Sequence, residues 1–312
     1  MKYTINEIAK LCNVGKSTVS RVLNKDPKVR SETREKVQRV IDRLGFQPNR
    51  SARAMRAGQE PVVGVIVSKL DSGSESQTLR AILQALQAEH ITPLIVESRF
   101  EAEQVRHHFQ LFRERQVNAV ILFGFFPLPL EIVREWQGSL VVIARTYPNI
   151  SSVYYDDEQA ITRLMTELYR QGHRRISYLG IQDSDETTGK LRTQSYLQFC
   201  RSHNIRPNSV SVELSAESAY LHCAELFTRP VDALVCATGR LALGAFKFSQ
   251  QSGRVFPIAY VGYNELLQYM MPNALSLDFG YCQAGLKAVE LLMRQLRGKS
   301  STEHYLVSTH QP

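Results

Sequence analysis

The sequence has little of what secreted, membrane-spanning or metal-binding proteins need. Its five cysteines are scattered and form no CxxC pair, so we expect reduced, mostly buried thiols and neither a zinc site nor a disulfide framework. The first residues, MKYTINEI, lack the long apolar run of a signal peptide, and no apolar stretch approaches the ~20 residues of a membrane span. These absences predict a cytoplasmic protein without a membrane partner, a metal or a cofactor.

Catalytic motifs are missing as well. The sequence contains no GxSxG, no P-loop and no HExxH. His107, His108 and His173 have no partner at a catalytic spacing, and His173 follows Gly172 just before a predicted strand, which is typical of a turn. We therefore expect a protein that is not an enzyme.

The excess positive charge is confined to one end of the chain. Of the 312 residues, Met1–Glu60 holds 14 Lys and Arg against 6 Asp and Glu, a net charge of +8. The remainder holds 24 of each sign, and the length allows about two domains, of which only the first is basic. Such asymmetry favours a polyanionic partner, because phosphate neutralisation makes nucleic-acid binding strong.

Thr4–Asn24, TINEIAKLCNVGKSTVSRVLN, contains two short helical patterns around a turn at Asn13–Gly15. Apolar residues at helical spacing predict a buried face on the first helix: Ile5, Ile8, Ala9 and Leu11. The second helix begins at Lys16 or Ser17, and its polar face carries side chains that hydrogen-bond bases or phosphates: Lys16, Ser17, Ser20, Arg21 and Asn24. The pattern predicts a helix-turn-helix, although spacing alone fits an ordinary helical hairpin equally well. The charge asymmetry favours DNA binding.

Two further segments complete the basic region. A helix from Ser31 to Gly45 has an apolar stripe, with Arg34 where a capping box prefers Glu or Gln. The Arg-rich segment Pro48–Gly58 is either a short helix that forms only against a partner such as DNA, or a flexible linker.

Beyond residue 61, β-branched runs alternate with helical patterns, which predicts parallel sheets with covering helices. Strands are predicted at residues 62–68, 92–98, 119–125, 140–145, 175–180, 209–214, 233–238 and 258–263, with a last strand at Tyr305–Val307. Helices are predicted at residues 79–88, 102–115, 130–137, 158–171, 189–203, 217–227, 241–252 and 282–296. Two such series predict two doubly wound subdomains with a ligand at the carboxyl ends of the strands.

The runs TINEIAKLCNVGKSTVSRVLN, REKV and PNRSARAM, followed by this body, resemble the lactose-repressor/galactose-repressor family of bacterial regulators over essentially the whole chain. The resemblance implies a small all-α helix-turn-helix domain (1–46), a hinge helix and linker (47–60), and an effector-binding and dimerisation domain (61–312). The last would have an α/β, periplasmic-binding-protein-like fold of two subdomains, approximately 61–157 plus 280–312, and 158–279. The missing signal peptide and the basic first 60 residues disfavour a free sugar-binding protein.

The resemblance also implies how DNA is read. The second helix would enter the major groove of a palindromic operator, with Lys16, Ser17 and Arg21 at base edges and Thr18 and Ser20 near phosphate. Gly15 stands where many members carry Ser, and Met55 stands where they wedge a Leu into the minor groove. The expected DNA-binding residues are Thr4, Lys16, Ser17, Thr18, Ser20, Arg21, Asn24, Asn49, Arg50, Ala52 and Met55.

Strand ends in the body carry more cations than is usual for neutral-sugar binders of this family. Any of these charges alone is more often a solvated surface group, but their convergence on strand ends favours an anionic effector, most simply a phosphorylated sugar. The expected effector-binding residues are Lys69, Asp71, Glu75, Arg145, Thr188, Gly189, Lys190, Arg192, Thr238 and Asn264. Gly239 stands where related repressors usually have Asp.

Several segments are similar to the family members that control trehalose genes: NRSARAMR, VIVSKLDSGSES, YYDDEQAI, ISYLG and TTGK. This similarity implies a repressor released by trehalose 6-phosphate, with Lys69 and Arg145 on the phosphate and Glu75 on a sugar hydroxyl. Another sugar or sugar phosphate, or a corepressor, remains the alternative. No leucine heptads follow the helix at 282–296, which favours a homodimer over a tetramer.

Overall fold

The computed structural model describes residues 5–23, 26, 28–44, 61–136, 138–182, 185–298 and 301–309. It divides into two compact units, Met1–Gln59 and Glu60–Pro312. We call the described parts of these units the head (residues 5–44) and the body (residues 61–309) and treat each by itself. No helix in these ranges is long and apolar enough to cross a lipid bilayer.

The head consists of three helices, α1 (Ile5–Leu11), α2 (Lys16–Leu23) and α3 (Ser31–Leu44). One small core joins them: Ile8, Ala9, Cys12, Val19, Val22, Val37 and Ile41. Asn13 adopts a positive φ of 48° in the turn, as its residue type allows. Leu11 was expected in the core but is 53% exposed, because α1 ends there and the chain turns away.

Arg34, in the first turn of α3, acts differently from a capping-box residue. Its Nη2 donates to the backbone oxygens of Asp26 (3.0 Å) and Val29 (3.2 Å). A cation can satisfy carbonyls of the preceding loop, whereas a Glu at this position would bond to backbone N–H groups. Arg34 therefore fixes the loop between α2 and α3.

Subdomain 1 of the body is a six-stranded parallel sheet in the order β11-β5-β4-β3-β1-β2. Its strands are β1 (Val63–Val67), β2 (Leu94–Glu97), β3 (Ala119–Phe123), β4 (Ser139–Ile143), β5 (Ser151–Tyr155) and β11 (His304–Val307). Its helices are α5 (Gly73–Ala88), α6 (Ala102–Glu114), α7 (Leu130–Arg134) and α13 (Tyr281–Leu296). The central strands β1, β3 and β4 are buried at every residue, as their continuous apolar runs predict.

Subdomain 2 is a five-stranded parallel sheet in the order β10-β9-β8-β6-β7. Its strands are β6 (Ile176–Ile181), β7 (Ser209–Val212), β8 (Ala233–Cys236), β9 (Ile258–Val261) and β10 (Leu275–Leu277). Its helices are α8 (Asp157–Arg170), the π-helical segment η1 (Glu186–Leu191), α9 (Arg192–Ser202), α10 (Ala216–Leu226), α11 (Gly239–Ser252) and α12 (Glu265–Met270). The expected α/β fold of two doubly wound subdomains is confirmed.

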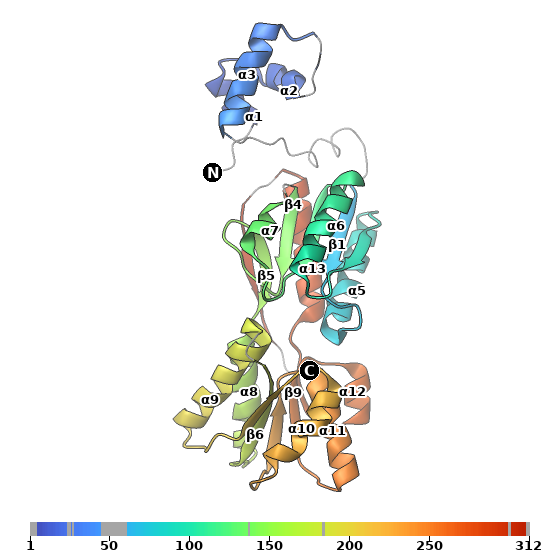
Figure 1. Cartoon of the computed structure of the whole chain (residues 1–312), viewed down its shortest axis with the longest axis vertical. Coiled ribbons are helices and arrows are strands. Elements are labelled where there is room, and N and C mark those ends of the chain that lie inside the picture. The colour runs from blue at the N-terminus through green and yellow to red at the C-terminus, as the bar shows by residue number, and fades with distance from the viewer. Residues whose placement is uncertain are drawn as a thin grey trace. The chain divides into compact units, whose positions relative to one another are not determined.

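The chain passes repeatedly between the two subdomains (Figure 1). It crosses from β5 to α8 and returns from β10 to α13. Both crossings leave the carboxyl end of a strand, and all strands within each sheet are parallel, so the carboxyl edges of the two sheets face each other. This is the edge at which open α/β sheets bind ligands.

Three elements escaped the sequence prediction. β5 begins with Ser151 and Ser152, which are buried but hydrogen-bonded: Glu303 N donates to Ser151 Oγ, and Ser152 Oγ pairs with His304 Nδ1 at 2.6 Å. Such a strand has no apolar run to reveal it. The other two, α12 and β10, are only six and three residues long.

Candidate DNA-binding and effector sites

The outer face of α2 is the candidate DNA-reading surface. Lys16, Ser17 and Arg21 are exposed, while Thr18 and Ser20 are half-buried. Val19 and Val22 are buried against the other helices and fix the orientation of α2. Among the described residues, Asp26 Oδ2 lies 4.0 Å from Arg21 Nε. This separation is too long to hold an exposed guanidinium, so Arg21 is available to a partner.

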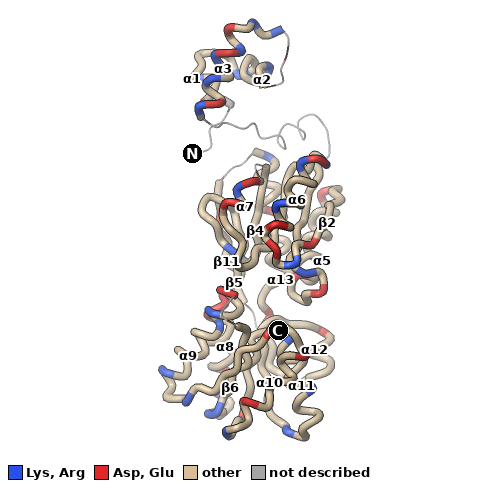
Figure 2. Tube along the Cα trace, viewed as in Figure 1, with Lys and Arg blue, Asp and Glu red and all other residues tan. Residues whose placement is uncertain are grey.

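Both the head and the body carry acidic and basic residues (Figure 2), but the excess of positive charge lies in the first 60 residues of the sequence. Expected DNA contacts that fall outside the described residues are Thr4, Asn24, Asn49, Arg50, Ala52 and Met55. The α2 face alone therefore carries the described part of the site.

Gly15 begins α2 without a capping side chain. Its carbonyl accepts from Thr18 N (2.9 Å) and Val19 N (3.2 Å), which places it at the N-cap. A Cβ at this position would meet Ser17 Oγ at 3.6 Å and Thr18 Oγ1 at 3.8 Å, both ordinary contacts. A Ser would fit here, so the structure does not require Gly.

On subdomain 1, Glu75 lies in the first turn of α5 and reaches back to the end of β1. Its Oε2 accepts from Ser68 N (2.7 Å) and Lys69 N (3.2 Å). Burial raises the pKa of Glu75 to about 7, and these backbone bonds oppose the rise. Glu75 thus braces the loop that presents Lys69, and its carboxyl group titrates near neutral pH.

Arg145 follows β4 at the same edge of the sheet. Lys69 follows β1, and one strand, β3, separates β1 from β4, so the two strand ends lie about 10 Å apart. Arg145 Nη1 is buried without a partner of hydrogen-bond geometry in the described part of the chain. The hydroxyl of Tyr147 is nearby, since Arg145 opposes the rise that burial causes in the pKa of Tyr147. This hydroxyl donates to Leu128 O at 2.9 Å, and its oxygen keeps lone pairs that can accept from Arg145.

Polar contacts bridge the two subdomains at this edge. Arg145 Nη2 donates to Glu186 Oε2 of η1 at 2.6 Å. Arg240 of α11 binds the loop after β1, with Nη2 at 2.7 Å from Asp71 O and Nη1 at 3.4 Å from Asp71 Oδ2.

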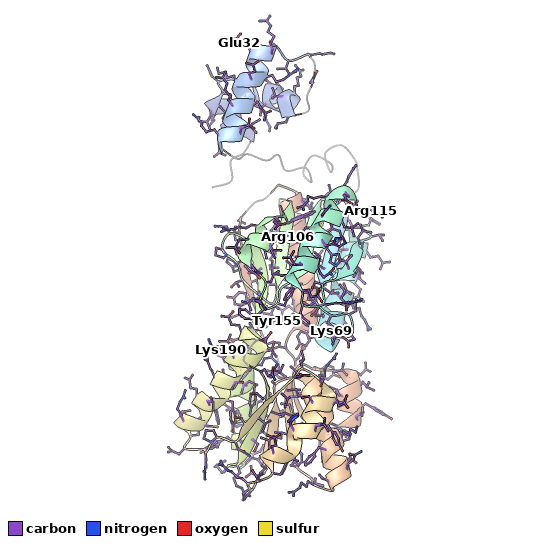
Figure 3. All side chains as sticks on the ribbon, in the orientation of Figure 1. Glu32, Lys69, Arg106, Arg115, Tyr155 and Lys190 are labelled. Carbon is purple, nitrogen blue, oxygen red and sulfur yellow. The ribbon has the colours of Figure 1, made fainter. Side chains whose placement is uncertain are left out.

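The third bridge joins Gln77 of α5 to subdomain 2: Gln77 Nε2 donates to Tyr263 O at 2.9 Å. Figure 3 shows Lys69 and Lys190 at the facing ends of the two subdomains, with Tyr155 between them. The junction is therefore a polar, charged region that both subdomains build.

Arg192 was expected among the effector ligands, but the structure places it in a buried ion pair. It is 4% exposed, and its Nε donates to Asp157 Oδ1 at 2.7 Å. Its Nη1 donates to Ala237 O at the end of β8, and its Cζ lies 4.8 Å from the ring centroid of Phe279. Burial raises the pKa of Asp157, and the adjacent Arg192 opposes that rise. Arg192 thus holds protein groups together in this arrangement.

The aromatic side chains of the two crossings pack on one another beside this ion pair. Tyr155, at the end of β5, stacks on Phe279 at 4.9 Å, and Tyr281 meets both rings edge-on. Thr78 of α5 contacts the Tyr155 hydroxyl at 3.5 Å. The segments that connect the subdomains are thus joined to each other and to the Arg192 pair.

The amino end of η1 holds an anion from the protein itself. Asp185 Oδ1 accepts from Thr188 N (2.6 Å) and Gly189 N (3.2 Å). Gly189 is buried with the backbone oxygen of Gln182 only 2.4 Å from where a Cβ would stand, so the residue must be Gly. Lys190 is exposed at the same end of subdomain 2.

Thr238 and Asn264 both serve as N-caps, of α11 and α12 respectively. Thr238 Oγ1 accepts from Leu241 N, and Asn264 Oδ1 accepts from Leu267 N. At Gly239, a Cβ would lie 2.7 Å from Leu267 Cδ1. An Asp at Gly239 would therefore need the end of the Leu267 side chain to move.

A surface hollow of about 420 Å³ lies elsewhere on subdomain 2, over α10 and the end of β7. Glu213 and Glu217 line it, and two carboxylates would repel an anionic ligand. In the described ranges, no group of three or more His, Cys, Asp or Glu side chains is placed to hold a metal ion.

Sequence reasoning overlooked several residues of the junction, including three charged residues that pair there: Arg240, Glu186 and Asp157. Arg240 directly follows Gly239 at a predicted strand end, so its position contained a usable signal. Glu186 and Asp157 carried none, because their partners Arg145 and Arg192 are 41 and 35 residues away.

Comparison with known proteins agrees with this architecture. Residues 4–49 match the model of bacterial regulatory proteins, lacI family, and residues 165–310 match the periplasmic binding protein-like domain. The chain is 42% identical over 307 residues to the HTH-type transcriptional regulator TreR of Escherichia coli (strain K12), covering 98% of each protein.

Among solved structures, the chain resembles the trehalose repressor from Escherichia coli, with a TM-score of 0.79 and 38% identity. The match covers 81% of this chain and 100% of that one. A lac repressor dimer bound to operator and the anti-inducer ONPF matches 99% of this chain and 97% of its own, with a TM-score of 0.70. At 22% identity, that second likeness supports the fold alone.

Proposed function

The chain belongs to the lacI family of bacterial regulatory proteins, and from that premise we propose that it represses trehalose uptake and utilisation genes until trehalose 6-phosphate releases it from its operator. The observation that carries the proposal is the 42% identity to TreR over 98% of both chains, together with the 38% identity to a structure named a trehalose repressor. The protein would act by binding alone, as a homodimer on a palindromic operator.

The head supplies the DNA contacts. The exposed side chains of α2, Lys16, Ser17 and Arg21, suit base edges in the major groove, and Thr18 and Ser20 at the flank suit phosphates. Two heads of a dimer would read half-sites about one helical turn, ~34 Å, or a multiple of it apart. We propose that Asn49, Arg50, Ala52 and Met55 add contacts in the hinge, with Met55 as a minor-groove wedge.

The junction of the body supplies the effector site. Arg145 has a half-satisfied guanidinium at the carboxyl edge of subdomain 1. Lys69, whose Nζ lies 3.7 Å from Asp71 Oδ1, follows a strand that ends about two strand spacings away. A guanidinium and an ammonium suit a phosphate. Glu75 braces the Lys69 loop and offers a carboxyl group to a sugar hydroxyl. From subdomain 2, Lys190, Thr238 and Asn264 lie on segments that begin at the facing strand ends.

Release would follow from the position of this site. A ligand that contacts both subdomains favours the arrangement in which its contacts are best, and it shifts the population by the difference in its affinity for the two arrangements. The aromatic contact of the crossings, Tyr155 on Phe279, joins the segments that such a rearrangement must bend. A coupling of 1–3 kcal/mol corresponds to an operator affinity lower by roughly 5- to 150-fold.

A gel-shift titration tests the proposal. Trehalose 6-phosphate should release an operator fragment from the full-length protein, whereas trehalose at the same concentration should release less. If trehalose 6-phosphate leaves the complex unchanged, the effector assignment is wrong. A thermal-shift screen of this protein with a neutral disaccharide, a phosphorylated disaccharide and a nucleobase then distinguishes the alternatives. A response to another sugar indicates a different effector, and a response to the nucleobase indicates a corepressor.

A further inference from the structure

Arg145, the proposed phosphate ligand, already carries an anion of the protein itself. Its Nη2 lies 2.6 Å from Glu186 Oε2, an ion pair between the end of β4 in subdomain 1 and η1 in subdomain 2. The two partners differ in accessibility, since the side chain of Arg145 is 17% exposed and that of Glu186 is 50% exposed. Arg145 is therefore the more buried partner, and Glu186 is the partner that another anion could displace.

The arginine is held in place by its surroundings. A Cβ at Gly124 would lie 2.9 Å from Arg145 Cβ, so the base of the side chain rests directly on the backbone after β3. The guanidinium lies over the Phe126 ring, with Cζ 5.3 Å from its centroid. The preceding residue, Ala144, has a φ of 70°, a conformation that non-glycine residues keep only where the surrounding structure enforces it.

The pair leaves part of this cation unused. Glu186 is bonded to Nη2, while the buried Nη1 has no partner of hydrogen-bond geometry in the described residues. A phosphate monoester carries about −1.5 to −2 charges at neutral pH and three strong acceptor oxygens, more than one carboxylate offers. It could serve both Nη1 and Nη2, whereas a sugar hydroxyl cannot replace the lost negative charge.

We propose that Glu186 is an internal competitor of the effector phosphate for Arg145, so that only an anionic sugar opens this bridge between the subdomains. The inference rests on the proposed function, since it takes a phosphorylated sugar as the effector. A neutral sugar would leave the Arg145–Glu186 bridge closed, because removing Glu186 without another anion strands a largely buried charge. Recognition of the phosphate and loss of a contact between subdomains are then the same event.

The simpler interpretation is a surface ion pair that only adds stability, and a double-mutant cycle separates the two. We would measure the Kd of trehalose 6-phosphate and of trehalose by calorimetry on the full-length protein. The variants are Glu186→Gln, Arg145→Gln and the double variant. The matched control is Glu167→Gln, which removes the same charge from an Arg–Glu pair of 2.8 Å within α8.

We expect Glu186→Gln to bind trehalose 6-phosphate roughly 3- to 10-fold more tightly than wild type, the range for losing a half-exposed competing ion pair. The same substitution should change nothing in the Arg145→Gln background, and trehalose affinity should stay within about twofold. Unchanged or weaker binding of trehalose 6-phosphate by Glu186→Gln overturns the inference. An equal gain in affinity for trehalose 6-phosphate in the Arg145→Gln background, or in Glu167→Gln, also overturns the inference, because it indicates a general charge effect.

The two levels of the proposal fail in different ways. A wild-type protein that does not bind trehalose 6-phosphate refutes the proposed effector and the competition together. A wild-type protein that binds it, with a cycle that shows no coupling between Glu186 and Arg145, refutes the competition alone. Operator binding without effector verifies that each variant is folded.

Discussion

Asp157→Asn removes the only counter-charge described for a guanidinium that is 4% exposed, and it changes the side-chain shape very little. The hydrogen bond of Arg192 to Ala237 O cannot neutralise the charge, because a carbonyl oxygen is uncharged. Removing one partner of a buried ion pair typically costs about 3–5 kcal/mol. For a body of this size, each kcal/mol lowers the melting temperature by roughly 2–4 °C, so we expect a drop of about 6–20 °C.

Differential scanning calorimetry on the full-length protein measures this drop, with Glu167→Gln as the control. The partner of Glu167, Arg170, is 73% exposed, so that pair should contribute about 1 kcal/mol or less. A double variant, Asp157→Asn with Arg192→Met, removes the stranded charge and should recover much of the loss. If Asp157→Asn melts within a degree or two of Glu167→Gln, the pair does not support the junction as we infer.

Three further predictions concern the head and the junction. Gly15→Ser should tighten operator binding a few-fold in a gel shift, because the hydroxyl adds an N-cap and a possible phosphate contact; weaker binding would contradict the fit found at this position. Arg21→Ala should cost roughly 1–3 kcal/mol of operator affinity by fluorescence anisotropy and relax base preference, whereas Arg201→Ala on α9 should change neither. The pKa of Glu75 in the folded protein, about 7, exceeds the ordinary 4.5, so ionisation of Glu75 destabilises the fold as pH rises. Urea unfolding should therefore give Glu75→Gln a free energy of unfolding roughly 1–3 kcal/mol above wild type at pH 8 and close to wild type at pH 5. An equal difference at both pH values would refute this.

The fold was readable from the sequence wherever burial and apolarity coincide. The runs that form β1, β3 and β4 are continuous and β-branched, and each is buried throughout. The prediction failed at β5, where Ser151 and Ser152 are buried but satisfied by partners more than 150 residues away. Hydropathy records how apolar a residue is, and it cannot record a hydrogen bond to a distant one.

The candidate site was only partly readable for a related reason. A cation at a strand end is visible in the sequence, and Lys69 and Arg145 lie at the predicted edge. Whether that cation is already neutralised depends on residues that the fold brings together. Arg192 looked like Arg145 in sequence, yet Asp157 pairs with it in the core while Arg145 retains a buried Nη1. The sequence pattern thus predicted where these cations lie, but only the packing shows whether each cation is free to bind a ligand.

That difference decides which arginine can act as a switch. Exchanging the anion on Arg192 would strand a carboxylate that is 6% exposed, at a cost of several kcal/mol that exceeds the 1–3 kcal/mol typical of coupling between sites. On Arg145 the carboxylate that leaves is half exposed and can be solvated by water, so the exchange costs far less. In our proposal the two ion pairs therefore have different roles: the Asp157–Arg192 pair holds the connecting segments together, and the Arg145–Glu186 pair opens when a stronger anion binds Arg145.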